Sequence, residues 1–292
     1  MNKREKAPVF TTVASLVDGV SDLVSLPQAY VRICDLVEDP DTCARDITEV
    51  VQSDPALAGR VLRLANSAYT GYPTQIDSID LAVRVLGMDQ IHEMALATSA
   101  VGSLSNLRVG VIDIYNFWRM SIYCAVCAKQ FAILAGLASP QRLFVSGLLH
   151  NVGNLVLAHA FPNEFTECHR QAIVKAQPCH LIQRELFGYD YAEVGAELMY
   201  QWKLPAALVR PIQLHTGAFT DPTEDEQPCA AVIHLAATTA LAAMSGSEDG
   251  EPVPEYDPIA IAVTGIEREM IDDFMEEADA EVSEVIAILI PD

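Results

Sequence analysis

Hydrophobic residues recur every three or four positions through most of this chain, and nowhere do they alternate with polar residues as in a half-buried strand. The segments with this spacing are 8–23, 28–37, 44–52, 55–66, 79–86, 90–101, 115–137, 140–150, 163–175, 178–187, 191–201 and 205–215. Because 51% of the 292 residues are hydrophobic, such helices can enclose a large core. The sequence therefore predicts an all-α protein, a multi-helix bundle.

Three of the predicted helices carry recognisable start signals. Asp54-Pro55 and Ser139-Pro140 each place a capping side chain before a proline at the first helical position. Asp190 and Glu193 have the spacing of a capping box, with Asp in place of Ser or Thr. These signals predict helices that begin at residues 55, 140 and 191.

The helical pattern lapses between residues 102 and 110, which divides the chain into two parts. We expect an N-terminal helical subdomain over residues 1–105 and a helical core over 110–292 that ends in an acidic helix. The two helical halves are expected to pack together. Residues 245–257, rich in Gly, Pro, Ser and acidic residues, are expected to form a mobile loop.

The formal net charge of −22 argues against nucleic acid and anionic membrane surfaces as partners, because both carry negative charge. From Gly217 onward, nineteen acidic residues stand against a single basic one, Arg268. Apolar residues recur at helical spacing between Met270 and Ile286, so an amphipathic helix is expected there. A solvated helix face accounts for the acidity better than a tail that steers a basic partner.

Cysteine usage and hydropathy indicate a cytoplasmic protein. The seven cysteines are odd in number and scattered, which does not suit a disulfide framework. Cys124 and Cys127 have the spacing of half a zinc site, but they lie in an apolar helical run and are expected to be buried thiols. The first residues lack a signal-peptide pattern, and the most apolar run, 230–244, is too short to span a bilayer.

The step His150-Asn151 is the first candidate for chemistry. A histidine followed directly by an aspartate binds metal in helical phosphohydrolases. Asparagine at the second position lacks the negative charge that anchors a hard divalent cation, and it cannot act as a general base.

The chain resembles the HDOD family, the divergent branch of the HD phosphohydrolase superfamily found in bacterial signalling proteins. The resemblance spans roughly residues 26–291, and its most specific part is the block Ser53-Asp-Pro-Ala-Leu-Ala-Gly-Arg-Val-Leu-Arg-Leu-Ala-Asn-Ser-Ala-Tyr69. Further matching blocks are 78–87, 117–121, 144–157, 193–198 and 202–205. The resemblance implies a family-specific subdomain over residues 1–105 and an HD-like core over 110–292.

The departures from the family pattern lie at its metal site. Met120 and Tyr191 stand where histidines are common, Asn151 replaces the aspartate and Asn154 replaces a lysine, while His150 and His215 remain. Two neutral ligands are too few for a hydrolytic metal centre. We therefore expect no catalytic residue, metal or other cofactor here, with the Tyr191 hydroxyl bonded to Asn151 or His150. The remaining histidines are expected to be structural: His92, His159, His169, His180 and His234.

Two functions follow from the resemblance. The first is a non-catalytic regulatory module in signal transduction, which acts by binding a signalling protein or a small ligand. The alternative is a metal-dependent phosphohydrolase acting on a nucleotide or signalling phosphoester, which requires a divalent metal. Nucleic acid and membrane are not expected as partners, and the oligomeric state stays open.

The family block also offers a candidate interaction surface. The polar and aromatic residues beside its apolar stripe are Arg60, Arg63, Asn66, Ser67 and Tyr69. Arginine and tyrosine are enriched where interfaces gain most of their binding energy. The alternative, held equal, is that both arginines form internal salt bridges and Asn66 caps a helix end.

Overall fold

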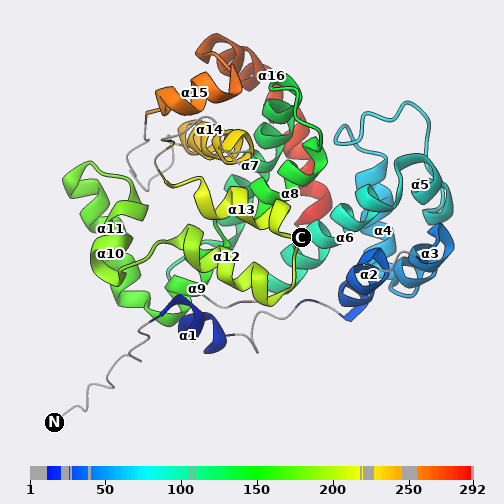
Figure 1. The fold of residues 1–292 in the computed structure, drawn as a ribbon, viewed down its shortest axis with the longest axis horizontal. Coiled ribbons are helices and arrows are strands. Elements are labelled where there is room, and N and C mark those ends of the chain that lie inside the picture. The colour runs from blue at the N-terminus through cyan, green and yellow to red at the C-terminus, as the bar shows by residue number, and fades with distance from the viewer. Residues whose placement is uncertain are drawn as a thin grey trace.

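The computed structural model describes residues 12–20, 26, 28–38, 41–105, 107, 109–217, 219, 227–244 and 255–290. These residues form sixteen helices and, within the same ranges, no strand, which confirms the all-α prediction (Figure 1). The helices are α1 (Val13–Asp18), α2 (Gln28–Glu38), α3 (Ala44–Gln52), α4 (Pro55–Ala65), α5 (Ile79–Leu86), α6 (Met88–Leu104), α7 (Ile114–Leu134), α8 (Pro140–Leu149), α9 (Val152–Ala160), α10 (Pro162–Lys175), α11 (Cys179–Phe187), α12 (Tyr191–Gln201), α13 (Ala206–Leu214), α14 (Gln227–Met244), α15 (Pro258–Thr264) and α16 (Arg268–Leu289).

The predicted start signals occupy helix N-termini. The Asp54 carboxylate accepts hydrogen bonds from the first turn of α4, and Asp190 forms a complete capping box with Glu193 at the start of α12. Helix α8 begins at the expected proline, but the side chain of Ser139 makes no capping hydrogen bond. The segment predicted to be a mobile loop lies largely outside the described residues, at 245–254.

The helices form two groups that the last helix joins. Helices α2–α6 pack on one another on one side, and α7 lies at the centre of the other group, against α8, α14 and α16 (Figure 1). Helix α16 also packs against α4 and α6 of the first group. Helix α1, although first in the chain, packs against α12 in the second group. The two helical sets therefore follow the chain from α2 onward, and both chain ends cross into the other half's territory.

A buried lysine joins the family block to the acidic helix α16. The ammonium of Lys129 on α7 donates to the Tyr69 carbonyl at 2.6 Å and pairs with the Glu281 carboxylate at 3.2 Å. The same ammonium lies 5.1 Å from the centre of the Tyr69 ring. One turn further along α16, the Glu284 carboxylate accepts the Ala68 backbone N–H at 3.0 Å. Part of the acidity of the last helix thus serves internal packing.

Two glycines allow α9 and α12 to cross with their backbones in contact. A Cβ built on Gly153 would overlap the Tyr191 carbonyl oxygen and lie 2.7 Å from the Gly195 nitrogen. Only glycine fits such an approach. The crossing places the start of α9 against the start of α12.

The apolar segments are core helices. Pro140–Ala160 and Gln227–Met244 are long and apolar enough to span a bilayer, but 83% and 61% of their most apolar windows are buried inside the fold. Cys124 and Cys127 are free, fully buried thiols on α7, as predicted. Helix α16 is amphipathic as predicted, with Ile271, Val282 and Val285 buried.

Candidate functional site

A cavity of about 120 Å³ lies where α7, α9 and α12 meet the residues that follow α8 and α13. All six residues predicted to form the remnant HD site line it: Met120, His150, Asn151, Asn154, Tyr191 and His215. The contact between α9 and α12 explains part of this convergence, because Asn151 caps α9 and Tyr191 is the first residue of α12. The structure therefore brings the whole predicted set together, although it does not assign it a role.

The two histidines of the predicted set are held in one tautomer by backbone carbonyls. Nδ1 of His150 lies 2.7 Å from the Gly147 carbonyl oxygen, and Nδ1 of His215 bonds to the Ile212 carbonyl. A carbonyl can only accept, so each Nδ1 carries the proton and each Nε2 carries a lone pair. Burial lowers the pKa of His150 to about 4 and the pKa of His215 well below its ordinary value. Both imidazoles are neutral at pH 7.

The remaining polar groups of the predicted set are bonded within the fold. The Ser121 hydroxyl donates to Oδ1 of Asn151 at 2.9 Å, and the Tyr191 hydroxyl lies 3.0 Å from Nε2 of His215. We expected that hydroxyl to bond Asn151 or His150. The bond to His215 corrects the expectation, because helix α12 aims the ring toward the residue that follows α13.

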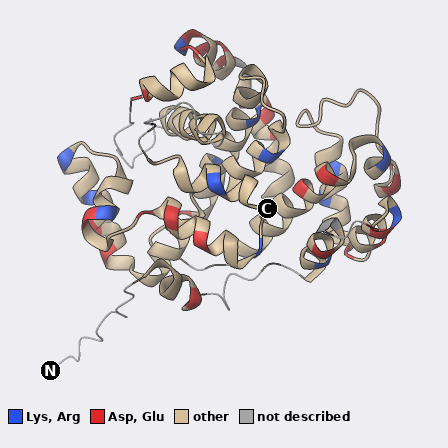
Figure 2. Ribbon diagram, in the orientation of Figure 1, with Lys and Arg blue, Asp and Glu red and all other residues tan. Residues whose placement is uncertain are grey.

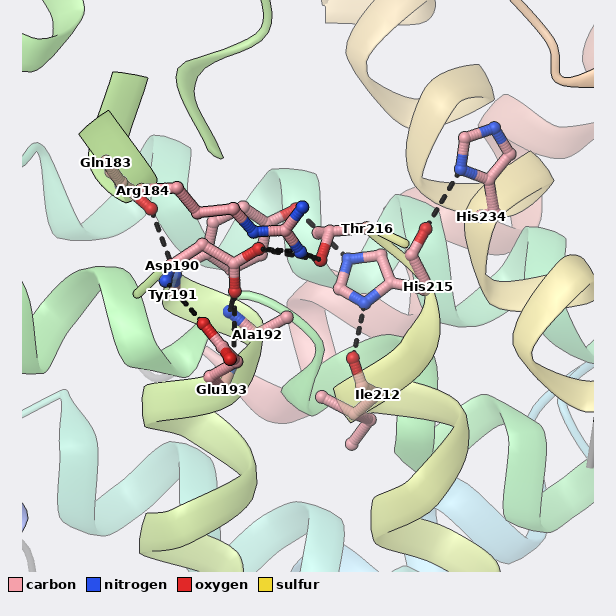
Figure 3. A network of polar contacts seen from close by, with 10 residues as sticks. All are labelled: Gln183, Arg184, Asp190, Tyr191, Ala192, Glu193, Ile212, His215, Thr216 and His234. Carbon is pink, nitrogen blue, oxygen red and sulfur yellow. Dashed lines mark hydrogen bonds and ion pairs between the residues drawn. The ribbon is translucent and has the colours of Figure 1, made fainter. Parts of the chain in front are cut away.

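A polar network surrounds the start of α12 (Figure 3). Asp190 is fully buried and receives hydrogen bonds from the backbone of α12 and from the Thr216 hydroxyl at 2.8 Å. Arg184 pairs with the Asp190 carboxylate at 2.7 Å. Gln183 accepts the Tyr191 N–H and donates to Asn154 Oδ1, both at 2.9 Å. Asn154 thus connects α9 to α11, and the network fixes Tyr191 and His215 in place.

Three further histidines line the cavity: His169, His180 and His234. Nδ1 of His234 lies 3.0 Å from the His215 carbonyl oxygen, while its Nε2 is buried without a hydrogen-bond partner among the described atoms (Figure 3). Burial lowers the pKa of His180 to about 4 and also lowers the pKa of His234. The sequence predicts these three only as structural residues, because α10, α11 and α14 bring them in from positions without a motif.

The predicted interaction surface is divided by the fold. Ser67 and Tyr69 are only 4% and 1% exposed, which corrects the expectation that they lie on a surface. Asn66 bonds the backbone of Ile76 through both amide atoms, and Arg60 reaches toward the Thr98 carbonyl at 3.4 Å. Arg63 alone of the five is an exposed cation. The lysine on α7, and not these arginines, pairs with the acidic helix.

The cavity does not have the donor set of a hydrolytic metal centre. No Asp or Glu is among the described residues that line it. Across the described part of the chain, no three His, Cys, Asp or Glu side chains lie together as a metal site requires. Nε2 of His215 is bonded to a tyrosine hydroxyl, and Met120 offers only a thioether. The residues present therefore do not fit a divalent metal.

Solved structures show the same fold. A protein of Shewanella amazonensis SB2B, named as a presumed phosphohydrolase, is 27% identical with a TM-score of 0.72; the match covers 94% of this chain and 97% of that one. An HDOD domain protein of unknown function from Geobacter sulfurreducens is 21% identical with a TM-score of 0.70, covering 95% and 98%.

A curated relative and a family model also match. An uncharacterised protein of Treponema pallidum (strain Nichols) is 26% identical over 242 residues, which is 82% of this chain and 46% of the relative. The chain therefore spans about half the length of that relative. The HDOD domain model matches residues 23–218, so α14–α16 lie beyond the matched region. This chain belongs to the HDOD family.

Proposed function

We propose that this protein is a non-catalytic regulatory module of signal transduction, which acts by binding a signalling protein or a small ligand. One observation carries the proposal: the polar groups at the HD step are used inside the fold. Ser121 donates to Asn151, and Tyr191 bonds Nε2 of His215. A hydrolytic centre needs such groups for metal and water.

The chemistry of the cavity supports binding rather than hydrolysis. Buried neutral imidazoles can accept or donate hydrogen bonds to a polar ligand without being charged. The described lining has no carboxylate that could serve as a general base. A small polar ligand therefore suits the cavity better than a phosphoester, which brings negative charge with no cation to meet it.

The alternative is a metal-dependent phosphohydrolase acting on a nucleotide or signalling phosphoester. The similarity to the Shewanella protein favours it, since that protein is named as a presumed phosphohydrolase. Under this alternative, a divalent metal would have to displace the Tyr191 hydroxyl from His215.

The same proposal places the protein in the cytoplasm, with neither nucleic acid nor membrane as a partner. Figure 2 shows Lys and Arg scattered among acidic positions rather than gathered along one helix. With a net charge of −22, such a surface gives a polyanion no continuous positive patch.

Metal content and turnover test the proposal together. The protein is purified without a polyhistidine tag, its iron, manganese and zinc are quantified by mass spectrometry, and generic phosphomonoester and phosphodiester substrates are assayed with each metal. We expect far less than one metal per chain and no turnover. Stoichiometric metal with turnover that His150→Ala abolishes would overturn the proposal. The matched control is His159→Ala, an exposed histidine on α9 that does not line the cavity.

A further inference from the structure

A second cavity, of about 300 Å³, lies apart from the histidine cavity, between the end of α7, the start of α8, α13 and the start of α14. Two arginines, Arg142 and Arg210, line it, and none of its described lining residues is acidic. The chain has 18 basic and 40 acidic residues. Two guanidinium groups on one cavity therefore stand out from the charge of the molecule as a whole.

The start of α8 adds to the positive character of this cavity. Ser139, the N-cap residue, lines the cavity and makes no capping hydrogen bond with its side chain. Pro140 has no N–H, so the N–H groups of Gln141 and Arg142 are the first that α8 can offer a ligand. The positive end of the helix dipole lies at the same place.

The arginines are held at the cavity wall without being fully neutralised there. The Arg142 side chain is 39% exposed, and its nearest printed carboxylate, Glu93 on α6, is 3.9 Å away. Burial raises the pKa of Glu93 to about 7, so that carboxyl is partly protonated at neutral pH. Arg210 donates to the Gln213 amide oxygen at 3.2 Å, which orients its guanidinium.

The other walls of the cavity are apolar. Leu137, Leu143 and Pro211 lie opposite or beside the charged groups and provide contact area for a hydrocarbon or ring system. A cavity of this volume is larger than a bare inorganic anion needs and lies at the lower end of the range for small-molecule sites.

We propose that this cavity binds a small organic anion, whose phosphate or carboxylate group contacts Arg142, Arg210 and the start of α8 while its apolar body packs on Leu137, Leu143 and Pro211. Arginine suits both anionic groups, because its planar fork matches their oxygens. The site is separate from the histidine cavity and does not depend on the proposed function.

Calorimetric titration of the full chain with three probes tests this assignment: AMP, hexanoate and inorganic phosphate. AMP and hexanoate carry the two anionic groups on apolar bodies, and phosphate carries none. We expect AMP or hexanoate to bind with a Kd of about 1 mM or tighter, and inorganic phosphate to bind more weakly. In Arg142→Gln and Arg210→Gln the affinity should fall about tenfold or more, since each loses charged hydrogen bonds.

Two variants serve as controls. Arg45→Gln removes a surface arginine of α3 that is 84% exposed and should bind the probe as the wild type does. His150→Ala, in the other cavity, should also leave the affinity unchanged. The proposal is overturned if no probe binds, if both cavity arginine variants bind normally, if phosphate binds as tightly as AMP and hexanoate, or if His150→Ala alone weakens binding. Should one glutamine variant fail to unfold cooperatively, the other decides.

Discussion

The hydroxyl of Tyr191 lies 3.0 Å from Nε2 of His215, so the first residue of α12 is bonded to the residue that follows α13. Nδ1 of His215 is already bonded to the Ile212 carbonyl, and the side chain is almost fully buried. Both ring nitrogens therefore have partners inside the fold. At this position a tyrosine has turned a would-be ligand into part of a packed, hydrogen-bonded core.

Tyr191→Phe removes only the hydroxyl of this pair. Nε2 of His215 then loses its printed partner in a buried place, and we expect the free energy of unfolding to fall by about 1–3 kcal/mol. Urea unfolding measures the change. Tyr200→Phe, on the same helix but 38% exposed, should change stability by less than about 0.5 kcal/mol. Equal effects in the two variants would show that the bond to His215 is not stabilising.

Helix positions follow from local signals that the chain carries openly. Asp54, before a proline, caps α4, and Asp190 closes the capping box of α12, where the predicted range 191–201 is also the observed one. Such signals depend on neighbours within four residues. The remnant site could be predicted as a set because the family pattern fixes which separate segments converge.

The contacts within the site could not be predicted in the same way. The sequence does not show that Ser121 reaches Asn151, or that Tyr191 turns toward His215, because these depend on how helices cross. For the same reason Tyr69 is misplaced on a surface in the sequence-based prediction. The packing of α7 and α16 around its loop buries it, and no local pattern reports that.

Gly153→Ala tests the crossing of α9 and α12. The new methyl group would overlap the Tyr191 carbonyl, so the helices must separate, and we expect a loss of about 1–3 kcal/mol or more. Gly59→Ala is the matched control, because a Cβ there meets nothing within 4 Å on the exposed face of α4. That change should stabilise the protein by about 0.5–1 kcal/mol. Thermal unfolding of both variants should therefore give shifts of opposite sign, and shifts of the same sign would contradict the backbone contact.

Lys129→Met tests the connection between α7, the family block and α16. The variant keeps the apolar stem but leaves the Tyr69 carbonyl and the Glu281 carboxylate without the ammonium. We expect a loss of about 2 kcal/mol, because both groups are largely buried. Lys175→Met breaks an exposed pair with Glu185 and should cost less than about 1 kcal/mol. If the two losses are the same by urea unfolding, the Lys129 contacts are not a buried junction.

The buried histidines predict a loss of stability in mild acid. Burial lowers the pKa of His150 from an unfolded value near 6.5 to about 4, so between these values the unfolded chain binds a proton that the folded one does not. Its contribution is complete above pH 6.5 and is lost as the pH falls toward 4. Glu93, with a pKa raised to about 7, opposes this trend, since its contribution is lost as the pH rises from about 4.5 to 7.

Variants separate these two contributions. In His150→Gln, the slope of unfolding free energy against pH between 4 and 6.5 should fall by up to about 1.4 kcal/mol per pH unit. His159→Gln, at an exposed position, should leave the slope as in the wild type. Urea unfolding at pH 5, 6 and 7 provides the measurement, and an unchanged slope in His150→Gln would mean that this imidazole is protonated in the fold.

Asn151→Asp restores the residue that the HD step ordinarily has, and we expect it to produce no hydrolase. The new carboxylate would still accept the Ser121 hydroxyl, Nε2 of His215 would still be bonded to Tyr191, and Met120 would still supply no imidazole. One added charge therefore does not complete a set of three ligands with room for water. Phosphomonoester and phosphodiester assays with iron, manganese or zinc should show the same background in the variant and the wild type. Metal-dependent turnover in the single variant, removed by a further His150→Ala change, would show that the cavity needs only a carboxylate to become an enzyme.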